Sequence, residues 1–549
     1  MKTLLPLTLA LLGAVASPTL LARVPFITWA SCPAELTGGT WPELGERLHC
    51  GKARMPFDHL RPDGRTIEVG VVRIAAEDQF KREGALFVNV GGPGGQPAAF
   101  VASMAAAFGA VEASDPLHGD RRRLLERFDL IAVIPRGLRG GWTYECDAVA
   151  PTRHFLPAHR DDANWKRAIA DARAQANACS VHAETAYLST EQHVRDMDAV
   201  RASLGDDTLN FYGISYGGRV GATYAALYPE RMGRMLLDSS LMFHRGYRTA
   251  MELTNDAQQD AFEKRVLAPI LHEPWRYGQV SDAGELQGAI RGFADELRPA
   301  WHDALISPAH LAAAMTMDRW VKASGWRNWR SLQSLAAANR FSLDAATDGA
   351  IRQAALELTQ RGASTVAGQV RGRHGNAHRH DSLVDRHGEW LNLAVMCNDE
   401  SWEPMQAKIR ARADRDAFTY TEADGSQIFD QLTCAAWPAR VARSPDFGVL
   451  ETRAPFLLIQ SEHDASTPLI GARAMLARFP SSRLVVAKGS SQHGLLAQSA
   501  TPCVEKAAMA YLLEGRLPEG PDRETACAFV PGEPYEDLTA SYEWDDARL

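Results

Sequence analysis

The stretch Leu209-Asn-Phe-Tyr-Gly-Ile-Ser-Tyr-Gly217 places a serine between a strand-like run and a helical run. Leu209–Tyr212 is predicted to be a short strand, and Val220–Tyr228 follows it as a helix. A sharp turn from strand to helix needs small residues on both sides of the serine, because Cβ atoms there would clash. The G-x-S-x-G pattern in this setting predicts that Ser215 stands on a tight turn with its hydroxyl exposed as a nucleophile.

Short apolar runs alternate with helical segments on either side of this turn. The runs are Thr66–Ile74, Ala85–Val90, Phe128–Ile134 and Met235–Leu237, followed much later by Pro455–Gln460 and Arg483–Ala487. Apolar strands that alternate with helices indicate a mostly parallel sheet with helices on both faces. Together with a serine on a strand-to-helix turn, this pattern predicts an α/β structure with the α/β-hydrolase fold.

The strand-like runs disappear between residues 241 and 437, where helical stretches rich in Ala, Leu, Gln and Arg take their place. A chain of 549 residues is also longer than one hydrophobic core usually organises. We therefore expect a first part of the sheet unit at 23–240, a large helical cap at 241–437, and the second part of the sheet unit at 438–549. The cap is inserted before the last two predicted strands.

Residues 1–16 have the organisation of a signal peptide. Lys2 supplies a positive charge, Leu4–Leu12 is mostly apolar, and Ala14-Val-Ala16 has the small-x-small form of a cleavage site. The apolar run is far shorter than the ~20 residues that a membrane-spanning helix needs. We expect residues 1–16 to be removed, and the mature protein to be secreted or periplasmic and not bound to a membrane.

Cysteine usage agrees with export. The chain has eight cysteines, Cys32, Cys50, Cys146, Cys179, Cys397, Cys434, Cys503 and Cys527. No C-x-x-C pattern occurs, which argues against a zinc ribbon or a thioredoxin-type redox site. The sequence does not choose rigorously among the possible connectivities, but the cysteines fall into four sequence-local couples. We expect each couple to form a disulfide in an oxidising compartment.

The formal net charge of −8 gives no general attraction to nucleic acid or to anionic lipid. We expect no nucleic-acid partner, no metal and no cofactor, and we expect a monomer.

A glycine-rich loop follows the predicted strand Ala85–Val90. In a hydrolase of this fold, the oxyanion hole takes one N–H from the residue after the nucleophile, here Tyr216, and a second from this earlier loop. Pro93 has no N–H to donate. Gly92 is therefore the preferred second donor, and Gly91 is the alternative.

A serine nucleophile needs a base, and the base needs a carboxylate that orients it. Asp464 and His493 each follow one of the last two predicted strands, at the sheet edge where such folds place catalytic groups. The order serine, aspartate, histidine is that of hydrolases with this turn. Glu462 is the alternative acid, and His463 is interpreted as structural because it is adjacent to Asp464.

The chain resembles the secreted bacterial tripeptidyl aminopeptidases, which are related to the proline iminopeptidases. The motifs that carry the resemblance are Gly91-Gly-Pro-Gly-Gly95, Gly213-Ile-Ser-Tyr-Gly-Gly218, Cys434-Ala-Ala-Trp-Pro438, Asp464-Ala-Ser-Thr-Pro468 and Gln492-His-Gly494. The resemblance implies a serine aminopeptidase acting on peptides, with Ser215, Asp464 and His493 as its triad. It also implies that Thr467 supports the loop of the acid.

An enzyme that acts at a peptide N-terminus must recognise an ammonium group, which requires a partly desolvated carboxylate. Asp399 and Glu400, late in the cap, are the candidates, and a solvated acidic turn is the alternative interpretation. Two other functions stay open at this stage. One is an esterase or lactonase that uses the same triad, and the other is a non-catalytic binding protein.

Overall fold

The computed structural model describes residues 26–146, 160–278, 282–301, 304–371, 381–420, 426–438, 442–452, 455–496, 501–520 and 522–528. The signal peptide expected at 1–16 lies outside the described residues.

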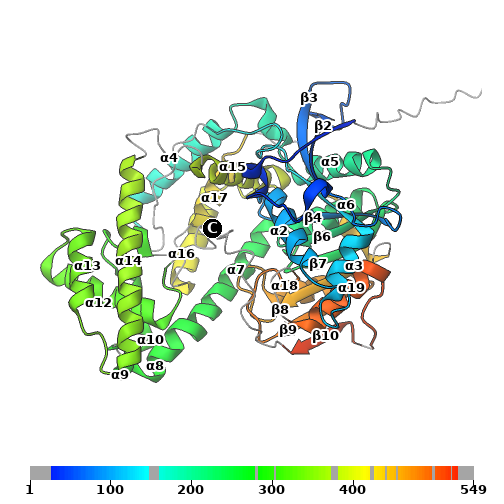
Figure 1. Ribbon diagram of the computed structural model, residues 1–549. Coiled ribbons are helices and arrows are strands. Elements are labelled where there is room, and N and C mark those ends of the chain that lie inside the picture. Colours follow the sequence, from blue (N-terminus) through cyan, green and yellow to red (C-terminus); the bar gives the residue numbers. More distant parts are fainter. Residues whose placement is uncertain are drawn as a thin grey trace, which may run out of the picture.

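A ten-stranded sheet forms the centre of the molecule, with the order β1-β2-β3-β5-β4-β6-β7-β8-β9-β10 (Figure 1). The strands are β1 Ile27–Ala30, β2 Leu48–Pro56, β3 Thr66–Ile74, β4 Gly84–Asn89, β5 Phe128–Val133, β6 Leu209–Ile214, β7 Met232–Asp238, β8 Phe456–Ser461, β9 Arg483–Lys488 and β10 Glu524–Ala528. Strands β1, β2, β3 and β5 pair antiparallel, and all other neighbours pair parallel. The predicted α/β-hydrolase fold with a mostly parallel sheet is confirmed.

The central strands are buried on both faces because helices cover them. Every residue of β4, β5 and β8 is buried, as expected for parallel strands between two helical layers. Helices α2 Pro97–Gly109, α3 Gly119–Arg127 and α19 Pro502–Glu514 lie along one face (Figure 1). Helices α5 Thr190–Ser203 and α6 Gly217–Leu227 pack together on the other.

The described residues between β7 and β8 form helices and no strand. The helices are α7 Tyr247–Phe262, α8 Ala268–His272, α9 Pro274–Tyr277, α10 Ala283–Arg291, α11 Arg298–Trp301, α12 Pro308–Ser324, α13 Trp329–Ala338, α14 Ala345–Arg371, α15 Asp381–Asp399, α16 Gln406–Thr419 and α17 Ser426–Ala435. Figure 1 shows α8 to α14 projecting to one side of the sheet, while α15 and α17 lie close to it.

Apolar packing explains this division of the helical segment. The helices from the end of α7 to α14 share a hydrophobic core of their own, centred on Trp301. Leu391 and Val395 of α15 belong instead to the core of the sheet unit. A third cluster joins Trp165 of α4 (Asp162–Cys179) to Phe429 of α17. We call the helices between β7 and β8, together with α4, the helical layer. Helix α4 precedes Ser215 in the chain.

The structure contains the disulfides Cys32–Cys50, Cys146–Cys179, Cys397–Cys434 and Cys503–Cys527, which are the four sequence-local couples. The third ties α15 to α17 within the helical layer. In the part of the chain that the structure describes, no helix combines the length and the apolar character needed to cross a bilayer.

Candidate active site

Ser215 stands at the junction between β6 and α6, where the chain makes a strained turn. Its φ of 58° lies in the left-handed region, which a side chain other than glycine rarely adopts. The flanking glycines make the turn possible, since a Cβ on Gly213 would come within 2.6 Å of the Gly217 carbonyl oxygen. Strain of this kind is retained where the surrounding structure enforces it, and it gathers at functional sites. The local geometry is therefore that of the predicted nucleophile turn.

Asp464 and His493 come together at the carboxyl ends of β8 and β9. His493 Nδ1 lies 2.9 Å from Asp464 Oδ2, at hydrogen-bond distance. With Nδ1 protonated, the imidazole donates to the carboxylate, and its Nε2 is then an acceptor. The structure thus pairs the acid and the histidine that the sequence analysis selected.

Several groups hold the Asp464 carboxylate in place. Its Oδ1 accepts the backbone N–H groups of Ser466 at 2.8 Å and Thr467 at 3.0 Å. Its Oδ2 also accepts from Thr467 Oγ1 at 2.9 Å and Gln460 Nε2 at 3.0 Å. Burial alone would raise the pKa of Asp464, but His493 and these hydrogen bonds together lower the pKa below its usual value. The carboxylate is accordingly ionised at neutral pH.

The alternative acid, Glu462, lies elsewhere in the loop. Its carboxylate accepts from Lys488 Nζ and, at 2.9 Å, from the Gly489 N–H. The neighbouring His463 has a half-exposed ring, 3.8 Å from Glu462. Neither residue is among the partners of Asp464 or His493 described above, so the geometry favours Asp464 as the acid.

The glycine-rich loop after β4 lies directly against the serine turn. A Cβ on Gly91 would come within 2.9 Å of Ser215 Cβ and 3.1 Å of Tyr216 N, so this close approach requires glycine. The Gly91 N–H is already used, because it donates to Asn89 Oδ1 at 3.0 Å. The Gly92 N–H donates to no other described residue, and the Tyr216 N–H is at the unsatisfied first turn of α6. Both N–H groups that the sequence analysis selected, those of Gly92 and Tyr216, thus have no partner among the described residues.

The chain is similar in sequence to known proteins over most of its length. A family model described as TAP-like protein matches residues 421–527, and one described as alpha/beta hydrolase fold matches residues 122–272. The chain is 27% identical over 529 residues to a tripeptidyl aminopeptidase of Streptomyces lividans, covering 91% of the chain and 86% of that relative. The chain is thus similar over most of its length to the tripeptidyl aminopeptidases. With these relatives and an α/β-hydrolase fold, it is a serine hydrolase.

Other relatives of this chain carry different names. Over 503 residues it is 25% identical to serine protease Hip1 of Mycobacterium tuberculosis, covering 85% of the chain and 86% of that protein. It is 24% identical over 533 residues to carboxylesterase B of the same species, covering 92% of the chain and 91% of that protein.

The helical layer contacts the glycine-rich loop of this hydrolase directly. A Cβ on Gly94 would come within 2.2 Å of the Gly388 carbonyl oxygen of α15, so the two backbones touch. Asn392 of the same helix donates from Nδ2 to the Pro93 carbonyl oxygen at 3.1 Å. Helix α15 therefore covers the glycine-rich loop next to Gly92.

Asp399, the last residue of α15, is enclosed by other residues of the protein. Its carboxylate accepts the Thr190 N–H at 3.0 Å and the Thr190 hydroxyl, and lies 3.6 Å from Arg219 Nε. Thr190 is the first residue of α5, whose unsatisfied N–H groups attract a negative charge. Asp399 is 4% exposed, so its carboxylate is occupied by internal contacts.

Glu400 has a different environment from its neighbour. Its Oε1 accepts the Tyr247 N–H at 2.7 Å and lies 3.2 Å from Arg219 Nη1. Its Oε2 has no hydrogen-bond partner among the described residues. Burial raises the pKa of Glu400, although Arg219 opposes the shift. The structure thus distinguishes the two acidic candidates, because Glu400 keeps one carboxylate oxygen without a partner among the described residues and Asp399 does not.

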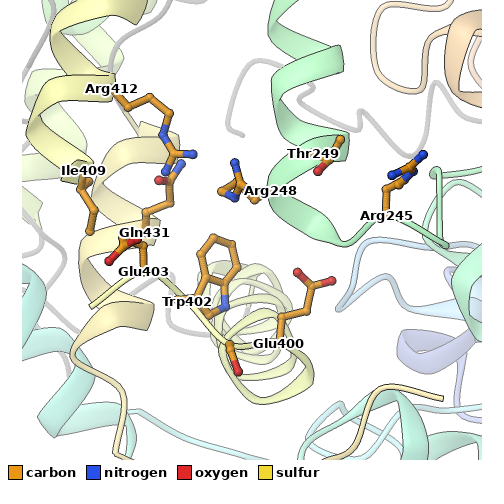
Figure 2. A pocket seen from close by; sticks show the side chains of 10 residues that line it. Arg245, Arg248, Thr249, Glu400, Trp402, Glu403, Ile409, Arg412 and Gln431 are labelled. Carbon is orange, nitrogen blue, oxygen red and sulfur yellow. The ribbon is translucent and has the colours of Figure 1, made fainter. Parts of the chain in front are cut away.

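A cavity of about 150 Å³ adjoins Glu400 (Figure 2). Trp402, Glu403, Arg248, Arg412 and Gln431 line it together with Glu400. In Figure 2 the Glu400 carboxylate points toward the start of α7, which carries Thr249. The cavity therefore offers a carboxylate next to an aromatic surface and to arginines.

Arg219 links these acids to the nucleophile helix, and it was not among the residues predicted from the sequence. Arg219 is 3% exposed, and its guanidinium lies 4.6 Å from the centre of the Tyr247 ring. Tyr247 in turn stacks on Tyr216, with ring centroids 6.2 Å apart. The position directly after Gly218 in the serine motif is the one sequence feature that could have drawn attention to Arg219.

Proposed function

We propose that this hydrolase is an exported serine exopeptidase that releases short peptides, tripeptides above all, from free N-termini. The observation that carries the proposal is the 2.9 Å contact between Asp464 and His493 at the sheet edge that also holds the strained Ser215 turn. These three groups form the nucleophile, base and orienting acid of acyl transfer. Peptides are the substrates, and the similarity to a tripeptidyl aminopeptidase agrees with this choice.

In the first half of the reaction, His493 Nε2 takes the proton of Ser215 as Oγ attacks the scissile carbonyl carbon. Asp464 keeps Nδ1 protonated and stabilises the imidazolium that forms. The carbonyl oxygen becomes an oxyanion and accepts the N–H groups of Gly92 and Tyr216. Each such donor contributes roughly 3 kcal/mol to transition-state stabilisation.

His493 then returns the proton to the leaving amine, which departs as the shortened peptide. The N-terminal fragment remains as an ester on Ser215. A water molecule gives its proton to His493 and attacks this ester. The second tetrahedral intermediate then collapses, His493 returns the proton to Ser215 Oγ, and the fragment leaves with a free carboxyl group. No cofactor enters either half.

The N-terminal specificity is attributed to the helical layer. Helix α15 covers the glycine-rich loop, so a chain end reaches the serine more easily than the middle of a folded polypeptide. Glu400 is the proposed partner of the substrate ammonium, because its Oε2 has no partner among the described residues and the group is 15% exposed. Asp399 then has a supporting role, since its contacts with Thr190 and Arg219 hold the end of α15.

The second candidate function is ester hydrolysis by the same three residues, as the similarity to a carboxylesterase favours. Both functions use an acyl-enzyme, and they differ in the need for a free amine. A charged partner such as Glu400 serves a peptide N-terminus and gives no advantage to a neutral ester.

Two measurements test the proposal. A fluorophosphonate should label the wild-type protein at Ser215, and Ser215→Ala should abolish labelling and turnover, whereas Ser203→Ala on α5 should keep both. Mass spectrometry of early products from an unblocked decapeptide should then show loss of three residues from its N-terminus. Labelling at another serine would refute the triad, and internal cleavage or C-terminal shortening would refute the exopeptidase.

A further inference from the structure

The end of strand β7 lies between the serine turn and the loop of the acid. The Ser215 N–H donates to the Asp238 carbonyl oxygen at 3.0 Å. On the other side, Thr467 Oγ1 lies 2.7 Å from the Ser239 carbonyl oxygen and 2.9 Å from Asp464 Oδ2, so its single proton is shared between these two acceptors. Asp238, the last residue of β7, and Ser239, which follows it, thus connect the nucleophile turn to the loop of the acid.

The same two residues hold the loop of the histidine through their side chains. The Asp238 carboxylate accepts the Leu495 N–H at 2.8 and 2.9 Å and the Leu496 N–H at 2.9 Å. The Ser239 hydroxyl accepts the Gly494 N–H at 2.9 Å. The N–H groups of the three residues that follow His493 in sequence therefore all donate to Asp238 or Ser239.

This arrangement carries two energetic costs. Asp238 is fully buried, and no ion pair to it occurs among the described residues. Its remaining donors are the hydroxyls of Tyr212 at 3.0 Å and Ser239 at 3.1 Å. Ser239 has a φ of 48°, and it and Ser215 are the two described non-glycine residues in this region. A buried carboxylate with only neutral donors and a strained backbone are costs that structures retain at functional sites.

We propose that Asp238 and Ser239 are positioning residues that set the location of His493 relative to Ser215 and Asp464. The inference rests on the proposed role of His493 as the base. Proton transfer requires the histidine within hydrogen-bond reach of the serine, and small displacements reduce the rate steeply. The hydrogen bonds from residues 494–496 fix the backbone next to the ring, so they fix the ring position as well.

Asp238→Ala and Asp238→Asn test the role of the carboxylate. Alanine removes every acceptor, so we expect kcat to fall at least 100-fold with KM changed less than threefold. Without its aligned contact to Asp464, the imidazolium of His493 loses stabilisation, and the acidic limb of the pH profile of kcat/KM should move to lower pH. Asparagine can accept both N–H groups at the Oδ2 position and donate to Ser239, so it should restore kcat to within tenfold of the wild type.

Asp129→Ala is the matched control, because Asp129 is equally buried but lies in β5, where it accepts from Arg73, Arg82 and the Ala76 N–H. This variant should lose stability while its kcat and pH profile stay unchanged. Equal kcat losses in Asp238→Ala and Asp129→Ala would overturn the proposal. So would an Asp238→Ala variant that keeps kcat within threefold, or an Asp238→Asn variant that is as impaired as Asp238→Ala.

Ser239→Ala and Ser239→Gly decide the question if Asp238→Ala does not fold. Both lose the acceptor for Gly494, and only glycine relieves the backbone strain. We expect kcat to fall about tenfold in both, as for the loss of one hydrogen bond, with glycine the more stable variant. Full kcat in both would contradict the inference. Any ester or amide hydrolysed at Ser215 serves as substrate, so the outcome is independent of exopeptidase specificity, and a failure of the triad itself appears as an unlabelled Ser215 in the wild type.

Discussion

Glu400 accepts the backbone N–H of Tyr247 at 2.7 Å, which anchors one carboxylate oxygen at the first turn of α7 and leaves the other without a partner among the described residues. Asp399, one residue earlier, has both oxygens engaged by Thr190. Adjacent residues on the same helix end therefore differ in what they can offer a ligand. This difference decides which of them is proposed to bind the substrate amine.

Glu400→Gln is expected to lower kcat/KM for unblocked peptides by 10- to 100-fold, on the order of a charge-assisted hydrogen bond. The same variant should hydrolyse an N-acetylated substrate or a small ester at the wild-type rate. Steady-state kinetics on matched substrates measures both. A uniform loss on all substrates would show that Glu400 supports the structure and does not select the amine.

Asp399→Asn provides the comparison within the same helix end. Because it weakens a buried network with Thr190 and Arg219, it should reduce the free energy of unfolding by about 3 kcal/mol. The preference for unblocked over blocked substrates should stay as in the wild type. Denaturant unfolding and the two-substrate assay separate these effects, and a lost preference at unchanged stability would reverse the assignment of the two acids.

Asp464→Asn is expected to lower kcat by about 10,000-fold, because the amide no longer keeps His493 in the tautomer that accepts the serine proton. The matched control is Glu462→Gln, which changes an acid two residues away whose partners are Lys488 and Gly489. It should retain kcat within threefold. Activity that fell in Glu462→Gln and persisted in Asp464→Asn would transfer the acid role to Glu462.

His193 gives the fold a dependence on pH near the active site. It is 6% exposed beside the glycine-rich loop, and burial, opposed by Asp196, lowers the pKa of its ring from 6.5 to about 4. Its neutral form is the one that the fold favours, so its contribution is complete above pH 6.5 and is lost as pH falls toward 4. Linkage predicts a loss of about 3 kcal/mol across this window.

His193→Gln keeps an acceptor for Asn89 Nδ2, which lies 3.4 Å from His193 Nε2, and cannot be protonated. Its stability should therefore be flatter than that of the wild type between pH 6.5 and 4. Urea unfolding at half-unit steps of pH measures the difference. Parallel curves for the two proteins would contradict the assignment to His193.

The mature protein should contain no free thiol. Peptide mapping under non-reducing conditions is expected to recover Cys32–Cys50, Cys146–Cys179, Cys397–Cys434 and Cys503–Cys527. Reduction should release each pair into separate peptides. A cross-linked peptide that joins two different couples would contradict both the sequence-local pairing and the structure.

The sequence predicted those parts of the fold whose signals are local. The turn at Ser215 is specified by the glycines beside it, and the short strand predicted before it corresponds to β6. The six predicted apolar runs correspond to β3, β4, β5, β7, β8 and β9. Strand β2 was missed because it is not an apolar run: exposed Lys52 and Arg54 alternate with buried Ala53 and Met55. Strand β10 is short and mostly polar at the sheet edge, so its pairing with β9 depends on tertiary context.

Contacts between residues far apart in the chain could not be predicted from the sequence, for a different reason. Asp238 looks like the polar end of an ordinary strand, and its bonds to the loop of His493 cross more than 250 residues of chain. Arg219 lies in the nucleophile helix, and its acidic partners, Asp399 and Glu400, lie late in the helical insertion. Helix α4 has an amphipathic face whose partner, α17, is equally distant. Spacing within a segment carries no information about such contacts.

The preference for a free N-terminus is the most direct test of the proposed exopeptidase. The measurement is kcat/KM for a tripeptide chromogenic amide with a free amine and for the same compound after acetylation, each at several pH values. Acetylation is expected to lower kcat/KM at least 100-fold, about 2.7 kcal/mol, because Glu400 is left without its ammonium partner. Equal rates on the free and the acetylated substrate would contradict it and would indicate an endopeptidase or a general esterase.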